Sequence, residues 1–459
     1  MPEGICPDSY RGETMNLLFI SLGCDKNLVD SEVMLGIVEK DGYTIVDCEE
    51  DADIIVINTC CFIHDAKEES IQTILEMAEY KKTGRLKALI VAGCLAQRYK
   101  EEIIAEIPEV DAVLGTTSYD KIAETIKKAL NNSGFIELTD INALPLVDIR
   151  RLVTTGGHFA YLKIAEGCDK HCTYCIIPKL RGNYRSVPME RLVNEAKALA
   201  DQGVRELLLV AQETTLYGKD LYGEKSLHIL LRKLCKIQGL RWIRILYCYP
   251  EEIDDKLIQV MKEEKKICHY LDLPIQHSED EILRRMGRRT TRQQLISTIR
   301  KLRREIPDIV LRTTLITGFP GETKEQHEAL MDFVDEMEFE RLGVFTYSPE
   351  EDTPAADFSG QIAEEVKEER RAELMELQQE IVFDQAEAMT GRELLVMIEG
   401  KVADEDAYVG RTYMDAPNVD GLIFVNTDKE LMSGDFAKVT VTGAAEYDLI
   451  GELSDEFTK

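Results

Sequence analysis

Three cysteines stand close together in the middle of the chain, in the stretch GCDKHCTYCIIPKLRG. Cys168, Cys172 and Cys175 follow one another at intervals of four and three residues. Such short spacing is typical of ligands for zinc or for an iron–sulfur cluster, and both centres usually take four protein ligands. Three thiols therefore either join His171 around zinc or leave one iron of a cluster open to a small molecule. Three buried thiols without a metal are the remaining interpretation.

Three further cysteines end apolar, β-rich runs near the N-terminus. Cys24 ends ISLGC, Cys60 ends INTC and Cys94 ends VAGC. Because parallel strands have their carboxyl ends at one edge of a sheet, we expect these cysteines to converge and to leave a second iron open. Cys61 competes with Cys60, since chain direction at a strand end does not decide which thiol points inward.

The surrounding pattern predicts three folded parts. Short strands alternate with helices over 15–131, which indicates an open parallel α/β domain. Residues 132–155 lose this rhythm and are predicted to be a linker. A second alternation over 156–385 indicates an α/β barrel or partial barrel, with a charged helix over 361–390 at its end. Short strands and turns over 386–455 indicate a small antiparallel β-barrel.

Composition limits the class of protein. The 459 residues are 44% apolar and carry a net charge of −30, which excludes a disordered chain and a protein that coats naked nucleic acid through its general field. The N-terminus has no signal-peptide pattern and no apolar run is long enough to span a membrane, so we expect a cytoplasmic protein without a membrane partner. Met15 is an alternative start. Outside the two triads, the cysteines are interpreted as packing residues or incidental thiols rather than disulfides: Cys6, Cys48, Cys61, Cys235, Cys248 and Cys268.

The middle motif, with Tyr174 before its last cysteine, resembles that of the radical S-adenosylmethionine (SAM) enzymes. In that family three cysteines hold a [4Fe-4S] cluster whose open iron chelates SAM, and reductive cleavage of SAM yields a radical that abstracts hydrogen. The resemblance implies that Tyr174 lies near the adenine. Gln212, Glu213 and Gln276 end later strands and are predicted to bind the same cofactor, with polar closure of a strand end as the alternative.

The words SLGCDKNLVDSE, VINTCCFI and VAGCLAQRY resemble the N-terminal domain of the methylthiotransferases, a branch of the radical enzymes with two clusters. The C-terminal barrel resembles their TRAM domain. The resemblance implies that Cys24, Cys60 and Cys94 hold a second [4Fe-4S] cluster, with Cys60 rather than Cys61 as the ligand. It also implies insertion of a methylthio group at an inert C–H bond. No catalytic residue beyond the cluster ligands is assigned.

Two features favour one substrate class within that family. Lys26 before Asn27 resembles the branch that modifies the β-carbon of an aspartate in small-subunit ribosomal protein S-twelve, whereas the tRNA adenosine methylthiotransferases have G-C-Q-M-N at this place. Residues 380–459 carry 18 Asp and Glu against six Lys and Arg, a net of −12, which favours a lysine- and arginine-rich protein over a phosphate backbone. A solvated acidic surface is the plain alternative. Residues 284–304, with nine basic and no acidic side chains, point towards RNA or towards carboxylates of SAM and substrate.

The implied partners are therefore ribosomal protein S-twelve, free or within the ribosomal subunit, and a low-potential electron donor such as flavodoxin or ferredoxin. Binding of tRNA is not expected. A non-catalytic electron carrier or cluster scaffold is the alternative from another class. Carriers usually ligate their clusters fully, however, and do not need a large barrel.

Overall fold

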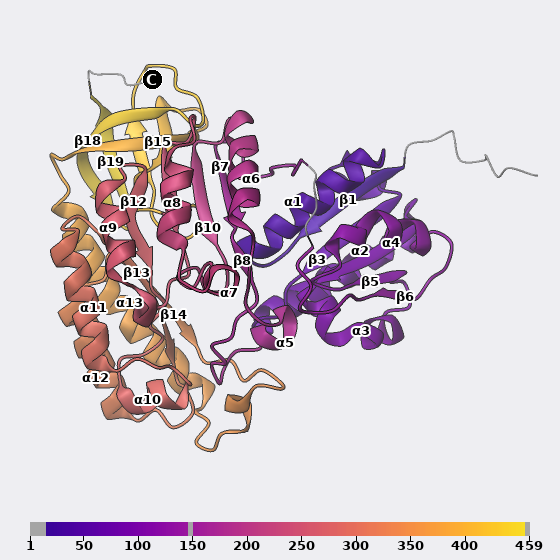
Figure 1. The fold of residues 1–459 in the computed structure, drawn as a ribbon, viewed down its shortest axis with the longest axis horizontal. Coiled ribbons are helices and arrows are strands. Elements are labelled where there is room, and N and C mark those ends of the chain that lie inside the picture. The colour runs from indigo at the N-terminus through magenta and orange to yellow at the C-terminus, as the bar shows by residue number, and fades with distance from the viewer. Residues whose placement is uncertain (1–14, 146–149, 455–459) are drawn as a thin grey trace, which may run out of the picture. The chain divides into compact units, whose positions relative to one another are not determined.

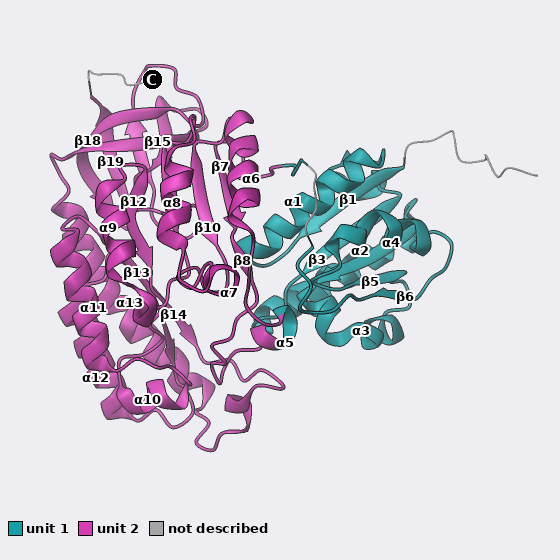
Figure 2. Cartoon of the chain, viewed as in Figure 1, with its two compact units in different colours: residues 1–152, 179–181 teal, residues 153–178, 182–459 magenta. Residues whose placement is uncertain are grey.

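The computed structural model describes residues 15–145 and 150–454 (Figure 1). They form two compact units, one of residues 1–152 with 179–181 and one of residues 153–178 with 182–459 (Figure 2). The segment before Met15, with Cys6, lies outside the described residues.

Unit 1 is built on a six-stranded parallel sheet with the order β2-β1-β3-β4-β5-β6. The strand bounds are β1 Asn16–Ser21, β2 Thr44–Val46, β3 Ile54–Thr59, β4 Ala88–Gly93, β5 Ala112–Leu114 and β6 Phe135–Glu137. The connecting helices are α1 Asp25–Lys40, α2 His64–Thr83, α3 Cys94–Glu106 and α4 Ile122–Ala129. The predicted open parallel α/β fold is confirmed.

The central strands of this sheet are buried along their whole length. β3 (IIVINT) and β4 (ALIVAG) are continuous apolar runs, as expected for parallel strands covered on both faces. α1 and α4 pack on one face through an apolar cluster that includes Met34, Val38, Ile122 and Ile126. Strand order reverses between β1 and β3, so their carboxyl ends flank a topological switch point, where sheets of this kind bind ligands.

Strand β6 differs from the expectation for this part of the chain. It lies inside residues 132–155, which the sequence indicated as a linker, and pairs with β5 in parallel. Its three residues are too short for a periodic pattern, and only the neighbouring strand defines them.

Unit 2 contains a second six-stranded parallel sheet, with the sequential order β7-β10-β11-β12-β13-β14 of a partial barrel. The strands are β7 Phe159–Lys163, β10 Glu206–Val210, β11 Trp242–Ile245, β12 Ile267–Asp272, β13 Val310–Thr317 and β14 Arg341–Thr346. The main helices are α6 Met189–Asp201, α8 Leu227–Cys235, α9 Asp255–Glu263, α11 Arg292–Glu305, α12 Lys324–Met337 and α13 Glu364–Glu387. The partial barrel and its charged last helix are as predicted.

Short elements surround the carboxyl ends of these strands. They are β8 Ala165–Glu166, β9 Arg185–Ser186, α5 Ile177–Arg181, α7 Lys219–Tyr222 and α10 Asp280–Arg285. β8 and β9 pair in antiparallel fashion and bracket the segment that carries the three middle cysteines. The last residues of α5, 179–181, group with unit 1.

The C-terminal part is a closed five-stranded barrel with the order β15-β16-β17-β19-β18. Its strands are β15 Glu393–Lys401, β16 Ala407–Arg411, β17 Ile423–Asn426, β18 Phe436–Ala445 and β19 Asp448–Leu453. The predicted small β-barrel is confirmed, with one parallel pairing, between β17 and β19, among the antiparallel ones.

A buried charge network attaches this barrel to the amino ends of the unit 2 strands. The Glu206 carboxylate, at the start of β10, accepts from Arg244 Nε and from Arg411 Nη2, each at 2.8 Å, and all three side chains are fully buried. Arg244 Nη1 also donates to the carbonyl oxygen of Tyr413 at 2.6 Å. The barrel therefore occupies the end of the sheet opposite the strand carboxyl ends, where α/β barrels place their chemistry.

Two of the acidic barrel residues serve the same contact. Asp415 pairs with Arg341, and Asp420 lies 3.3 Å from Arg312 Nε and accepts from the Tyr270 hydroxyl at 2.7 Å. Part of the negative charge of the barrel is thus paired with arginines of the unit 2 sheet.

No α-helix among the described residues is long and apolar enough to cross a bilayer.

Glu206→Gln tests the buried network. It removes the charge of the carboxylate that two buried guanidinium groups share, so we expect the free energy of unfolding to fall by about 3–5 kcal/mol. Urea denaturation of full-length protein measures it. The control is Glu393→Gln, which removes an exposed pair with Lys438 and should cost less than about 1 kcal/mol. Equal losses from both substitutions would contradict the assignment.

Candidate metal centres

The three N-terminal cysteines follow three neighbouring strands of unit 1. Cys24 caps α1 just after β1, Cys60 comes directly after β3, and Cys94 is the first residue of α3 after β4. Because β1, β3 and β4 are adjacent and parallel, the three thiols lie at one sheet edge, beside the switch point. The expected convergence is present.

Glycine makes the close approach of these loops possible. Gly23, just before Cys24, has φ +86°, and a Cβ there would lie 2.5 Å from the Cys60 Cβ. Any side chain would therefore displace the Cys60 loop and would also strain the backbone.

Cys60 and Cys61 are both buried beside the other thiols of this edge. Burial, with the neighbouring Cys94 and Cys24 thiols, raises the pKa of Cys60 to about 12. Burial and Cys94 also raise the pKa of Cys61. The Cys60 side chain lies against Gly23, the residue before Cys24.

The middle cysteines lie on a loop that unit 2 holds by main-chain contacts. The Cys168 amide donates to the Gly182 carbonyl at 3.1 Å, and the Thr173 amide donates to the Met286 carbonyl at 2.9 Å. The Thr173 hydroxyl donates to the Arg285 carbonyl at 2.8 Å. These contacts hold the cysteine loop against α5 and α10.

The donor set fits a cluster better than zinc. Burial raises the pKa of Cys168 to about 12, with a further contribution from Cys172, and raises the pKa of Cys175 for the same two reasons. A thiol must lose its proton to bind a metal, so a bound cation offsets these raised pKa values. Among the described residues, the only His, Cys, Asp or Glu ligand atoms that all lie within 4.8 Å of one another belong to Cys48, Glu49 and Glu50. Neither triad thus has the tight tetrahedral arrangement of zinc, and His171 is exposed.

Two predicted SAM contacts, Gln212 and Glu213, follow β10 and lie beside the cysteine loop. Gln212 Nε2 donates to Glu166 Oε1 at 2.8 Å, while the buried Gln212 Oε1 has no hydrogen-bond partner among the described residues. Burial raises the pKa of Glu213 to about 7, although Lys170, 3.6 Å away, acts in the opposite direction. An unsatisfied buried acceptor and a buried carboxyl fit a ligand that carries an ammonium group.

The other two predicted contacts are placed differently. Tyr174 packs against an apolar cluster that includes Met286, Phe319 and Tyr347, and its ring is thus part of the packing. Gln276 follows β12 with φ +72°, a conformation that is uncommon for residues other than glycine. The backbone N–H of Gln276 donates to the Thr314 carbonyl at 2.9 Å, and its backbone carbonyl accepts from the Ile316 N–H at 2.8 Å. A strained strand end of this kind is often functional.

Two cations lie beside the middle triad: Lys170, which sequence reasoning missed, and Arg288, which it named only as part of the basic stretch 284–304. Lys170 Nζ, between the first two cysteines, lies 2.6 Å from Glu252 and 3.3 Å from Glu251, and 4.7 Å from the Tyr249 ring centre. Arg288 stacks on the same ring at 4.3 Å and donates to the Pro274 carbonyl at 2.7 Å. The Tyr249 hydroxyl oxygen is 3.8 Å from Cys172 Sγ. For Lys170, its position inside the cysteine motif was the only signal in the sequence.

Most of the other basic side chains of residues 284–304 form ion pairs with acidic residues of unit 2. Five of its side chains form ion pairs with acidic residues: Arg292 with Glu279, Arg300 with Glu336, Lys301 with Asp255, Arg303 with Glu340 and Arg304 with Glu305. This pairing weakens its interpretation as an RNA contact.

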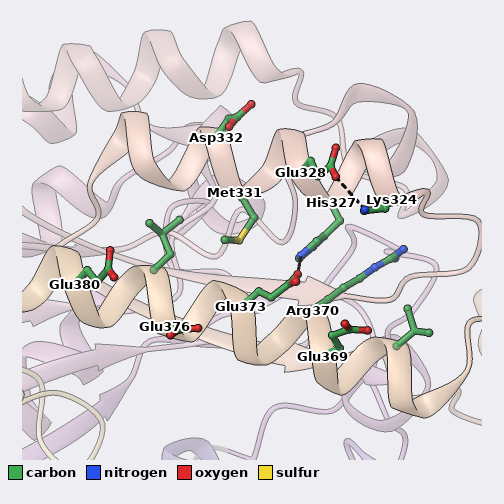
Figure 3. Close-up of a pocket in the computed structure, with 12 residues that line it drawn as sticks. Lys324, His327, Glu328, Met331, Asp332, Glu369, Arg370, Glu373, Glu376 and Glu380 are labelled. Carbon is green, nitrogen blue, oxygen red and sulfur yellow. Dashed lines mark hydrogen bonds and ion pairs between the residues drawn. The ribbon is translucent and has the colours of Figure 1, made fainter.

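A groove of about 820 Å³ lies between α12 and α13 (Figure 3). Most of its charged lining is acidic, and His327 Nε2 is 2.7 Å from Glu373 Oε2 across it. Neither triad and none of the predicted SAM contacts line the groove, so it is separate from the candidate metal centres.

Of the remaining described cysteines, Cys61, Cys235, Cys248 and Cys268 are buried and Cys48 is partly exposed. All are free thiols, in agreement with the expected absence of disulfides at these positions.

Comparison with protein families gives three matches. Residues 16–115 match the uncharacterized protein family UPF0004, residues 162–334 the radical SAM superfamily, and residues 390–453 a TRAM domain.

Two relatives that align over almost their full length carry the same name. A protein of Lachnoclostridium phytofermentans named "Ribosomal protein uS12 methylthiotransferase RimO" is 67% identical over 437 residues, which cover 95% of this chain and 99% of the relative. A protein of Acetivibrio thermocellus with the same name is 50% identical over 447 residues, covering 96% and 98%.

Solved structures share the fold. The radical SAM methyltransferase TsrM from Kitasatospora setae, with cobalamin and a [4Fe-4S] cluster bound, aligns with a TM-score of 0.55 at 14% identity, covering 75% of this chain and 74% of that one. A second TsrM structure, with tryptophan and a SAM analogue, aligns at 0.54, covering 92% and 82%.

Gly23→Ala tests the N-terminal site. We expect it to lower the iron content of reconstituted protein by about half, because the new methyl group displaces Cys60 while the other triad is untouched. The matched control is Gly42→Ala, where φ is +95° but nothing lies within 4 Å of the added Cβ. Chemical iron and sulfide analysis gives the result. Full iron content in Gly23→Ala would show that this contact does not shape a cluster site.

Proposed function

The chain belongs to the RimO family of ribosomal protein uS12 methylthiotransferases, and we propose that its two cysteine triads divide the family's reaction between them. The activity is that of a radical SAM methylthiotransferase acting on uS12. Within it, we assign the methylthio group to the β-carbon of an aspartate. The division into residues 15–131, 156–385 and 386–455 stays part of this proposal, with 132–155 as a connecting segment that contributes strand β6 to the first sheet.

The proposal is carried by one observation: each of two parallel sheets presents three thiols near its strand carboxyl ends. Cys168, Cys172 and Cys175 would hold one [4Fe-4S] cluster, and Cys24, Cys60 and Cys94 a second. When bound, these groups supply reductive cleavage of SAM at the first site and a sulfur carrier at the second.

The chain itself supplies position. The Thr173 contacts hold the first triad on its loop, and the unsatisfied Gln212 oxygen and the Glu213 carboxyl offer acceptors for the SAM amino group. Tyr174 and Gln276 complete the proposed SAM contacts, Tyr174 through its main chain. Holding the reacting groups in a fixed arrangement accounts for much of the rate that such sites achieve.

The tRNA methylthiotransferase is the second candidate, and two observations disfavour it. Much of the basic stretch 284–304 is paired with acidic residues, and the C-terminal barrel is acidic rather than basic. A protein that grips a phosphate backbone needs unpaired cations on its surface.

The remaining partners follow from the reaction. Reductive cleavage needs one electron at low potential, for which we propose flavodoxin or ferredoxin as donor. A ribosomal substrate, free or within the assembling subunit, places the enzyme in the cytoplasm under this proposal.

Two substitutions test the division of labour. Cys172→Ala should abolish both SAM cleavage and methylthiolation, since it removes a ligand of the radical site. Cys24→Ala should spare SAM cleavage and end methylthiolation. Cleavage is measured as 5′-deoxyadenosine and methylthiolation by mass spectrometry, using anaerobically reconstituted protein, reductant, sulfide, SAM and a peptide from the aspartate loop of uS12.

Cys61→Ala is the matched control, because this buried thiol adjoins Cys60 but lies outside the proposed ligand set; it should keep both activities. Bulk unmodified tRNA is the substrate control. A methylthio increment on tRNA alone would overturn the substrate assignment, and loss of SAM cleavage in folded Cys24→Ala protein would overturn the division.

A further inference from the structure

We propose that Arg181 is a positioning residue of the N-terminal site, which donates a hydrogen bond to the Cys94 sulfur and raises the reduction potential of the cluster held there. The inference rests on the second cluster of the proposed function. It concerns a residue that follows the last cysteine of the other triad, Cys175, by six positions in the sequence.

The guanidinium of Arg181 is fully buried in unit 1 and contacts three polar groups. Its Nη1 donates to Asp30 Oδ2 at 2.7 Å, and its Nη2 donates to the side-chain oxygen of Asn27. The same Nη2 lies 3.6 Å from Cys94 Sγ, within the range of a hydrogen bond to sulfur. One terminal nitrogen thus faces the Asp30 carboxylate and the other faces the Cys94 sulfur, so the guanidinium directs an N–H group to the thiol.

The surroundings fix this geometry. Asn27 Nδ2 donates to the carbonyl oxygens of Leu22 and Thr59, at 3.1 and 2.9 Å, and so ties the loop after β1 to the end of β3. The Thr116 hydroxyl donates to the Leu180 carbonyl at 2.8 Å and anchors the segment that carries Arg181. Arg181 connects Asn27 with the third strand end, that of β4, through its contact with Cys94. The asparagine and the arginine together therefore connect the loops of all three cysteines.

A buried cation beside a thiolate ligand has a predictable effect. Reduction adds a negative charge to a cluster, and a hydrogen bond to a ligand sulfur together with a nearby positive charge stabilises the reduced state more than the oxidised one. The low polarity of the site strengthens the interaction.

The test uses full-length protein in which Cys168, Cys172 and Cys175 are replaced by alanine, so that any cluster is the N-terminal one. In this background we expect Arg181→Gln to shift the midpoint potential to more negative values, and Arg181→Lys to recover part of the shift. Redox titration followed by electron paramagnetic resonance measures the potential, and it does not depend on turnover.

Arg151→Gln is the matched control. Arg151 is also buried in unit 1 and pairs with Glu32 at 3.1 Å, so its replacement likewise costs a buried ion pair. Its potential should equal that of the parent.

The double variant Asp30→Asn/Arg181→Gln separates potential from folding. It removes both charges of the ion pair and leaves neither buried alone, yet should still titrate at a more negative potential than Asp30→Asn. An unchanged potential in Arg181→Gln or in this pair would overturn the inference. Absence of iron already in the parent background would instead overturn the second cluster, and the role of Arg181 with it.

Discussion

Parallel strands place their carboxyl ends on one edge of a sheet, and this constraint decides where the cysteines of unit 1 meet. Cys24, Cys60 and Cys94 are separated by more than thirty residues each, yet β1, β3 and β4 are neighbours in the sheet. Strand order reverses between β1 and β3, so the chain leaves these two strands in opposite directions, the arrangement in which such sheets bind ligands. Close to the strand ends the two loops nevertheless touch. Asn27 joins them by hydrogen bonds, and Gly23 permits the contact because it has no side chain.

Unit 2 uses the same constraint at the opposite end of its strands. The amino ends of β10 to β14 hold the C-terminal barrel through buried charges, of which Glu206 with Arg244 and Arg411 is the centre. That attachment leaves the carboxyl ends to the cysteine loop and the polar residues around it. Some carboxylates of the acidic barrel pair with arginines at this contact, so the barrel has less free negative charge than its sequence indicates. The attraction between the barrel and a basic protein is weaker by that amount.

Much of the architecture could be predicted because it depends on local patterns. Apolar runs such as IIVINT and ALIVAG define central strands by themselves, and a cysteine directly after such a run must lie at the sheet edge. Strand β6 could not be predicted, since three residues hold no period and depend on β5. Cys60 could be chosen over Cys61 only through family resemblance, because the choice depends on which thiol faces Cys24. Arg181 and Lys170 were missed since ion pairing between distant segments leaves no pattern in sequence; the same reason makes the basic stretch 284–304 look freer than it is.

Each group of three cysteines is proposed to hold its own four-iron cluster. Iron analysis with Mössbauer spectroscopy measures this on anaerobically reconstituted protein and on the two variants that lack one triad each. Two clusters require about eight irons per chain in the intact protein and about four in each variant, all in [4Fe-4S] form. A tightly bound single metal, or a variant that loses all its iron when only Cys24, Cys60 and Cys94 are replaced, would contradict it.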